Sequence, residues 1–177
     1  MGDKKKCRKC KSFPCGCPIK IEHSINISPI DFVRDEIVQL FAYSQEIGSV
    51  SILSPVEHTL LSLDITTTEL GQRVKLDSMA VIQYITNTTG STFSLGGQYF
   101  LYRDNILIAF VDINKDAAKP ENVMERENLY PSLTWVDVPP TAGTHTYQLR
   151  VRVESGNIEI LDALTRSLNA IVFRQVL

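Results

Sequence analysis

The sequence predicts an all-β protein, an antiparallel β-sandwich of jelly-roll type with an N-terminal extended arm. Valine, isoleucine, threonine, tyrosine and phenylalanine recur along the chain, and these residue types favour strands. Several short segments alternate between apolar and polar residues, which is the period of a strand with one buried face. Turn-forming residues separate these segments at short intervals, as they do in sandwiches and barrels.

The length suits a single domain joined to a short arm. The chain has 177 residues, of which 44% are hydrophobic, so it can bury a core without disulfide staples. We predict a cysteine-rich basic connector over residues 1–20, called the arm below, and a sandwich over residues 21–177, called the body.

Charge is divided unevenly between these two parts. The arm carries seven lysines and arginines against one aspartate, a net charge of +6, and because the whole chain carries −2 the body carries −8. A basic arm on an acidic body could bind nucleic acid, an anionic surface or the acidic body of a second copy. The last option needs only the protein itself, so we expect no nucleic acid and no membrane as partner.

The first residues do not have the pattern of a secretory signal. Cysteines, lysines and prolines follow the basic start, where an apolar run would be needed. No apolar stretch has the length of a membrane span. We expect synthesis in a cytoplasm without a signal peptide.

All four cysteines lie in the arm, as Cys7, Cys10, Cys15 and Cys17. Zinc is one interpretation, because Cys7 and Cys10 have the spacing of a ligand pair, although Cys15 and Cys17 lie too close together for an ordinary knuckle. A like-charged tail with free thiols is a second interpretation. Disulfides are the third, and small loops within one arm would constrain little. Cysteines on an arm are therefore better suited to links between chains, and their basic neighbours favour the reactive thiolate.

The first half of the body contains three predicted elements. Residues 32–41 are ambiguous between strand and helix. Residues 61–65 alternate, with Leu61, Leu63 and Ile65 facing one way. Residues 73–76 also alternate, and the apolar run 79–82 follows them.

The middle of the chain predicts a hairpin followed by irregular structure. Residues 99–111 read as two strands joined by a polar tip at Arg103, Asp104 and Asn105, with Gly96 and Gly97 before the first strand. Residues 115–130 read as a long loop with a short helical piece begun by Pro120. Residues 137–143 are a loop, because adjacent prolines cannot pair in a sheet.

Two further strands complete a count of about eight to ten. In residues 147–153, Tyr147, Leu149, Val151 and Val153 face one way and polar residues face the other. Residues 167–173 are apolar on both faces except at Asn169, which predicts a central strand or one covered by another subunit.

No catalytic or cofactor-binding signature is recognisable, so we expect a protein that is not an enzyme and needs no cofactor. His23, His58 and His145 are scattered and read as surface or hydrogen-bonded residues. Trp135 reads as a core residue. Arg150 and Arg152 share one outer strand face, where they would meet acids of a neighbouring strand or subunit.

Residues 135–153 and 165–173 carry a resemblance to a family. Trp135-Val-Asp-Val-Pro-Pro-Thr-Ala-Gly-Thr-His-Thr-Tyr-Gln-Leu-Arg-Val-Arg-Val153 resembles the late strands of tumour-necrosis-factor-like jelly rolls. Together with Thr165-Arg-Ser-Leu-Asn-Ala-Ile-Val-Phe173, it is similar to jelly-roll domains on the surfaces of bacterial endospores. The cysteine-bearing arm points to the subunits of endospore appendages, which are pilus-like fibres. No collagen-like Gly-X-Y run is present, unlike in a typical exosporium glycoprotein.

The resemblance implies a self-assembling structural subunit of a spore-surface or extracellular fibre, made in the mother-cell cytoplasm. Cys7, Cys10, Cys15 and Cys17 would form disulfides to neighbouring subunits. Some appendage subunits have partner cysteines in the core, and this body has none, so the links would run from arm to arm or to a coat or exosporium anchor protein. The alternatives are a trimeric tip or binding module anchored by the arm, and a zinc-bearing interaction protein.

Overall fold

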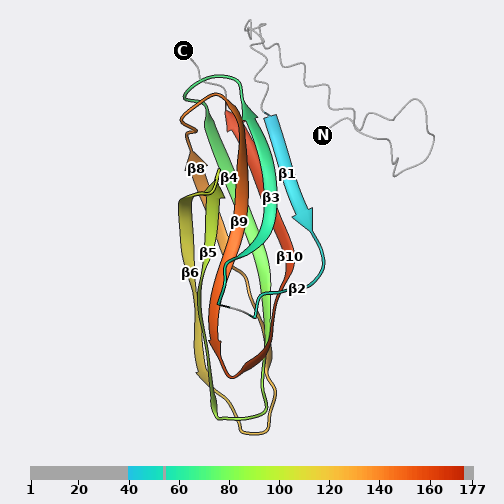
Figure 1. Ribbon diagram of the computed structural model, residues 1–177. Helices are drawn as coiled ribbons and strands as arrows, with labels where there is room; N and C mark the ends of the chain where they lie inside the picture. Colours follow the sequence, from blue (N-terminus) through green and yellow to red (C-terminus); the bar gives the residue numbers. More distant parts are fainter. Residues whose placement is uncertain (1–39, 54, 174–177) are drawn as a thin grey trace, which may run out of the picture. The chain divides into compact units, whose positions relative to one another are not determined.

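The computed structural model describes residues 40–53 and 55–173, which all belong to one unit, Glu36–Leu177. These residues form ten strands and no helix (Figure 1). The strands are β1 (Leu40–Glu46), β2 (Val50–Ser51), β3 (His58–Thr67), β4 (Arg73–Thr86), β5 (Thr92–Arg103), β6 (Ile106–Ala118), β7 (Arg126–Leu129), β8 (Ser132–Asp137), β9 (Gly143–Gly156) and β10 (Ile158–Phe173). The all-β prediction is confirmed, while the arm lies outside the described residues.

The strands make two antiparallel sheets that pack as a sandwich. One sheet has the order β1-β10-β4-β7, with β2 also paired to β10 and β8 to β4, and the other has the order β3-β9-β5-β6. The two long last strands insert between earlier ones, β9 between β3 and β5 and β10 between β1 and β4. This interleaving is the double Greek key of a jelly roll, so the predicted topology is confirmed.

The core lies between the sheets and follows the predicted alternation. Tyr147, Leu149, Val151 and Val153 on β9 are all buried, as are Leu61 and Ile65 on β3. Residues 167–173 belong to β10, which is central in its sheet, so that prediction is also confirmed. The described residues contain no cysteine, and the hydrophobic core is built from aliphatic and tyrosine side chains together with Phe93.

The predicted hairpin is confirmed but its strands are longer. Asp104 and Asn105 have φ values of 49° and 63°, which suit a two-residue turn between twisted strands. Gly96 and Gly97 do not precede the hairpin; they lie within β5. A Cβ on Gly97 would come 2.4 Å from the carbonyl oxygen of Arg152 on β9. Glycine therefore allows the two strands to approach closely at this point.

The predicted loop with a helical piece over residues 115–130 is wrong. β6 continues to Ala118, a turn follows with Asn122 at a φ of 59°, and β7 begins at Arg126. The turn is fixed by backbone hydrogen bonds, from the nitrogen of Lys119 to the oxygen of Ser91 and from that of Asn122 to Thr88. β7 pairs with β4 over residues 82–85, and a helix here would leave that edge of β4 unpaired.

The predicted loop over residues 137–143 is confirmed for residues 138–142, since Asp137 ends β8 and Gly143 begins β9. Of the range 32–41, only Leu40 and Phe41 are described, and they begin β1. In the described ranges, no helix is long and apolar enough to cross a membrane.

Candidate functional site

The four cysteines predicted as linking residues lie outside the described residues, as does His23, so the disulfide prediction stays a prediction. Within residues 40–53 and 55–173, no three side chains of histidine, cysteine, aspartate or glutamate lie close enough to hold a metal ion. His58 lies on β3 and His145 on β9, and the structure does not bring them together at one site. The described surface instead presents one polar cluster and two apolar surfaces.

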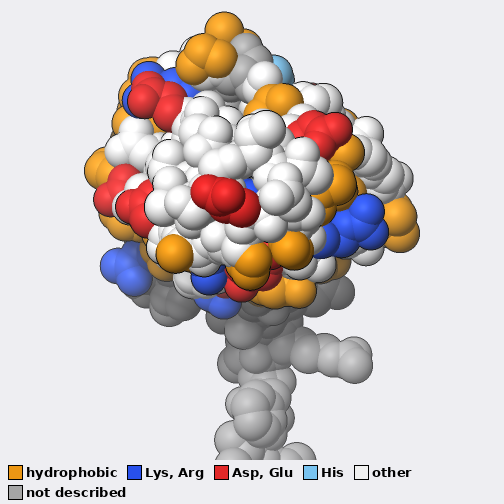
Figure 2. All heavy atoms as spheres, turned by 90° about the horizontal axis from the view of Figure 1, so that it is seen from below, with side chains coloured by type: hydrophobic (Ala, Val, Ile, Leu, Met, Phe, Trp, Pro, Cys, Tyr) orange, Lys and Arg blue, Asp and Glu red, His pale blue; other side chains and the backbone are white. Residues whose placement is uncertain are grey.

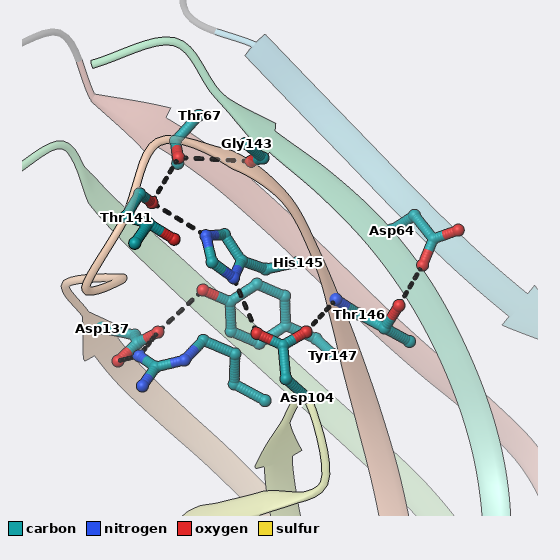
Figure 3. Close-up of polar contacts among 10 residues, drawn as sticks. Asp64, Thr67, Asp104, Asp137, Thr141, Gly143, His145, Thr146 and Tyr147 are labelled. Atoms are coloured by element: carbon teal, nitrogen blue, oxygen red, sulfur yellow. Dashed lines mark hydrogen bonds and ion pairs between the residues drawn. The ribbon is translucent and has the colours of Figure 1, made fainter. Parts of the chain in front are cut away.

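The polar cluster joins the β5–β6 turn to the loop before β9 (Figure 3). His145 Nδ1 lies 2.7 Å from Oδ2 of Asp104, and Nε2 lies 2.9 Å from the carbonyl oxygen of Thr141. Asp104 also accepts a hydrogen bond from the backbone nitrogen of Thr146, at 2.9 Å. The prediction that His145 is a hydrogen-bonded residue is confirmed.

The contacts of His145 favour its charged form. Both ring nitrogens face acceptors, and a neutral imidazole can donate from only one of them. Burial lowers the pKa of His145, but the hydrogen bonds to Asp104 and Thr141 outweigh this and hold the pKa above its ordinary value. Burial likewise raises the pKa of Asp104, and the hydrogen bonds from His145 and Thr146 reverse this, so that the net pKa is lowered.

Beside His145 and Asp104, Arg103 on β5 and Asp137 on β8 form an ion pair that joins the two sheets. The Nη1 atom of Arg103 lies 2.7 Å from both carboxylate oxygens of Asp137. The hydroxyl of Tyr147 donates to the same carboxylate at 2.7 Å. Burial and the nearby carboxylate raise the pKa of Tyr147, so its hydroxyl stays protonated and continues to donate.

Next to this ion pair, the sandwich has an open edge. β6 and β8 are each paired on one side only within the described chain, and their free edges face a groove of about 570 Å³ between the sheets. The groove is lined by Leu107, Ile108, Ala109, Phe110, Leu133, Thr134 and Trp135. We call this surface the groove below.

Trp135 shows why the groove is open. Its register partner on β4 is Leu76, which is fully buried, so Trp135 is on the inner face of its sheet. Its side chain is nevertheless 42% exposed, because β8 is an edge strand and no further strand covers it. The prediction of Trp135 as a core residue is therefore wrong.

The groove has a polar boundary at each end. The pair Arg103–Asp137 lies at one end, where β8 finishes. At the other end, Lys115 on β6 contacts Glu127 on β7 at 3.3 Å, and the hydroxyl of Tyr84 donates to Glu127. Those two hydrogen bonds lower the pKa of Glu127, so it stays ionised.

The second apolar surface is the outer face of β1 and β10. Phe41 and Tyr43 stack with ring centroids 5.9 Å apart, and their side chains are 58% and 66% exposed. Ile171 is the register partner of Phe41, and Phe173 lies two residues further along β10 on the same face. Single exposed apolar residues need no explanation, but a contiguous set marks a contact surface.

The outer face of the other sheet is polar. Arg150 on β9 contacts Glu57 at 3.0 Å and lies over the ring of Tyr102, with 4.3 Å from its guanidinium carbon to the ring centroid. Arg150 therefore meets an acid, in the residue directly before the neighbouring strand β3, while Arg152 donates to Gln98 at 3.4 Å. The end of the sandwich that includes the β4–β5 and β6–β7 turns has a surface of mixed chemical character. Figure 2 shows acidic, basic and apolar side chains interspersed there among polar atoms.

Comparison with known proteins adds likeness of fold alone. No family model matches the sequence, and no curated protein matches it. Among solved structures, the VP2 subviral particle of infectious bursal disease virus is 12% identical over 77% of this chain and 33% of VP2, with a TM-score of 0.43. The Gx strain of that virus gives 14% identity, the same coverage and a TM-score of 0.44. Dimeric latent PorU of Porphyromonas gingivalis gives 9% identity over 76% of this chain and 13% of PorU, with a TM-score of 0.38.

This chain spans a third or less of the length of these three solved chains. At such identities and TM-scores, the likeness carries no argument about function. The sequence did not predict the groove, because which strands lie at an edge depends on the order of strands in the sheets. The one available signal was Trp135 itself, a large apolar residue two positions before Asp137 and the proline loop.

Proposed function

We propose that the protein is a structural subunit, not an enzyme, that assembles with copies of itself into a disulfide-cross-linked fibre. One observation carries the proposal. All four cysteines lie within residues 7–17, while the described body buries its core without any cysteine. Covalent links can therefore leave only from the arm, and the body must associate by non-covalent packing.

The described surface supports this division of roles. The groove lies at the β8 edge of the β1-β10-β4-β7 sheet, and the outer face of β1 and β10 lies at the opposite edge, with β4 between them. Two different apolar surfaces on one body suit contacts with two neighbours at once. A contact between unlike surfaces can repeat without closing, which gives a fibre.

The resemblance to endospore appendage subunits supports a spore-surface or extracellular location, with synthesis in the mother-cell cytoplasm. On this proposal the partners are copies of the same chain and a coat or exosporium anchor protein. Cys7, Cys10, Cys15 and Cys17 form the links between subunits, and no cofactor is required.

The test replaces all four cysteines with serine, which keeps the charge and length of the arm. We expect the variant to fold and to associate, but to dissociate in hot detergent in which the oxidised parent stays assembled. Non-reducing gels of the parent should show a ladder of covalent multimers that reductant removes. Assemblies of the serine variant as resistant as those of the parent would contradict the proposal, and stoichiometric zinc in reduced protein would favour the zinc interpretation instead.

A trimeric tip module anchored by the arm is the second candidate. The exposed aromatic pair Phe41 and Tyr43 favours it, because a closed trimer would bury one such face on each copy. The mass of the serine variant in solution distinguishes the two. A trimer at all concentrations supports the tip module, and growth with concentration supports the fibre.

A further inference from the structure

The groove has the features of an acceptor for an extended chain. Leu107, Phe110 and Trp135 on its walls are 45%, 54% and 42% exposed. β6 offers a free edge of backbone donors and acceptors beside them, as far as the described residues extend. An unpaired edge next to an apolar groove is the arrangement in which an added strand gains both backbone hydrogen bonds and side-chain burial.

The chain contains a segment with the matching pattern. Ile19, Ile21, Ile25 and Ile27 alternate with Lys20, Glu22, Ser24 and Asn26, and His23 takes the remaining position on the isoleucine side. This alternation predicts a strand with one apolar and one polar face. We call residues 19–27 the isoleucine segment. It follows the last cysteine by two residues, and twelve residues separate it from the start of β1.

We propose that the isoleucine segment of one copy binds as an added strand along β6 of a neighbouring copy, with its isoleucines in the groove. The added strand would be the fifth in the β3-β9-β5-β6 sheet, and its alternate side chains would cover Leu133 and Trp135 of the facing sheet. Exposed Asp112 and Asp116 on β6 complement the basic residues that precede the segment. That the segment comes from a neighbouring copy rests on the proposed function, because cysteines that link copies place the residues directly after them on a neighbour.

Trp135 allows a direct test, because it is the only tryptophan in the chain. The experiment measures its emission maximum and its quenching by acrylamide in the reduced full-length protein, over a range of concentrations. We expect the emission to shift to shorter wavelength and the quenching to fall as concentration rises. Ile25→Asp should abolish both changes, while Ser24→Asp, which adds the same charge on the other face of the segment, should retain them.

A reciprocal pair of variants tests the groove. Ala109 lines the groove and is the register partner of the buried Leu101, so it lies on the inner face of β6, and Ala109→Asp should abolish the concentration-dependent shift. Val136→Asp, on an exposed residue that does not line the groove, should leave the shift in place. Far-ultraviolet circular dichroism checks that each variant remains folded. An emission that is the same in the parent and in Ile25→Asp would overturn the proposal. A shift that Ile25→Asp removes but that does not depend on concentration would place the segment in the groove of its own chain and overturn the assignment to a neighbour.

Because the protein is reduced, this measurement does not depend on disulfides. A concentration-dependent emission shift without covalent ladders in the oxidised protein would retain the groove and refute the disulfide-linked fibre. Covalent ladders without the emission shift would retain the disulfide-linked fibre and refute the binding of the isoleucine segment in the groove.

Discussion

At the scale of single residues, His145 is the charged residue that connects two separate turns. It lies on β9 and contacts Asp104 in the β5–β6 turn and Thr141 in the loop before β9. The side chain of His145 is 7% exposed and that of Asp104 is 42% exposed, so water screens the carboxylate but not the ring. Because both partners titrate, the contribution of this link to stability should depend on pH. Because water screens the carboxylate, that contribution should be moderate in size.

The pH range of the link follows from the two pKa shifts. His145 has a raised pKa in the fold, so its contribution to stability is complete below the ordinary value of 6.5 and is lost as pH rises through the folded value. Asp104 has a lowered pKa, so its contribution is present above 3.8 and is lost as pH falls through the folded value. The link is therefore strongest between these limits, near pH 5.

We predict that His145→Gln lowers the free energy of unfolding by about 1 kcal/mol near pH 5. This is the value expected for a hydrogen bond between charged groups, reduced because Asp104 is exposed to solvent. The difference from the parent should shrink as pH rises from 5 to 9, because the raised pKa of His145 means that the contribution of its charged ring is lost as pH increases through the folded value. Urea unfolding of the reduced protein at the two pH values measures this. A deficit of equal size at both would mean that packing, and not charge, explains the role of His145.

At the scale of elements, the close approach of the paired strands β5 and β9 depends on one glycine, Gly97. A Cβ at Gly97 would overlap the carbonyl oxygen of Arg152, whereas a Cβ at Gly96 would lie 3.6 Å from its nearest neighbour, an oxygen of Asn114. The two glycines are adjacent in β5, and both lie between the same two neighbouring strands, β6 and β9. They therefore form a matched pair for substitution.

Gly97→Ala should lower the free energy of unfolding by about 1–3 kcal/mol, since the added methyl group forces β5 and β9 apart. Gly96→Ala should leave stability unchanged or raise it by up to about 1 kcal/mol, because alanine loses less backbone entropy on folding. Thermal or urea unfolding of the two variants under reducing conditions measures both. Equal effects would show that β5 and β9 can separate at this point without cost.

Elements with strict alternation could be predicted from the sequence, and elements defined by their neighbours could not. Residues 147–153 alternate because β9 has one buried and one wet face. Residues 126–129 have no such pattern, because β7 is a short edge strand held by pairing with β4.

The burial of Arg166 could not be predicted either, because this charged residue is 2% exposed within the apolar strand β10. It fills an irregularity in that strand by donating to the carbonyl oxygens of Gly48, Ala163 and Leu164.

The candidate site was predictable only in part, for the same reason. The cysteine arm could be identified from composition, because all four cysteines occur within residues 7–17. The groove could not, since exposure of Trp135 and Phe110 follows from the positions of β8 and β6 at the edges of their sheets. A contact surface on β10 could be predicted, because residues 167–173 are apolar on both faces except at Asn169, and such a strand needs a cover on each side.

At the scale of the whole molecule, charge should contribute to association as well as apolar contact. The arm carries +6 and the rest of the chain −8, so an arm is attracted to the body of any neighbouring copy. The attraction is screened over about 10 Å at 0.1 M salt and over about 3 Å at 1 M. Apolar contacts respond in the opposite way, since salts that are excluded from protein surfaces strengthen them.

We predict that the variant with all four cysteines replaced by serine associates more weakly as sodium chloride rises from 20 mM to 500 mM, because only non-covalent forces remain and the attraction between arm and body is screened. Sedimentation velocity at fixed protein concentration measures the distribution of assemblies at each salt concentration. A second variant in the same background, with Lys4, Lys5 and Lys6 changed to glutamine, should associate less at low salt and respond less to added salt, since half of the arm's net charge is removed. If both variants associate more strongly as salt rises, contacts between copies are apolar in character, and the charge difference between arm and body does not drive assembly.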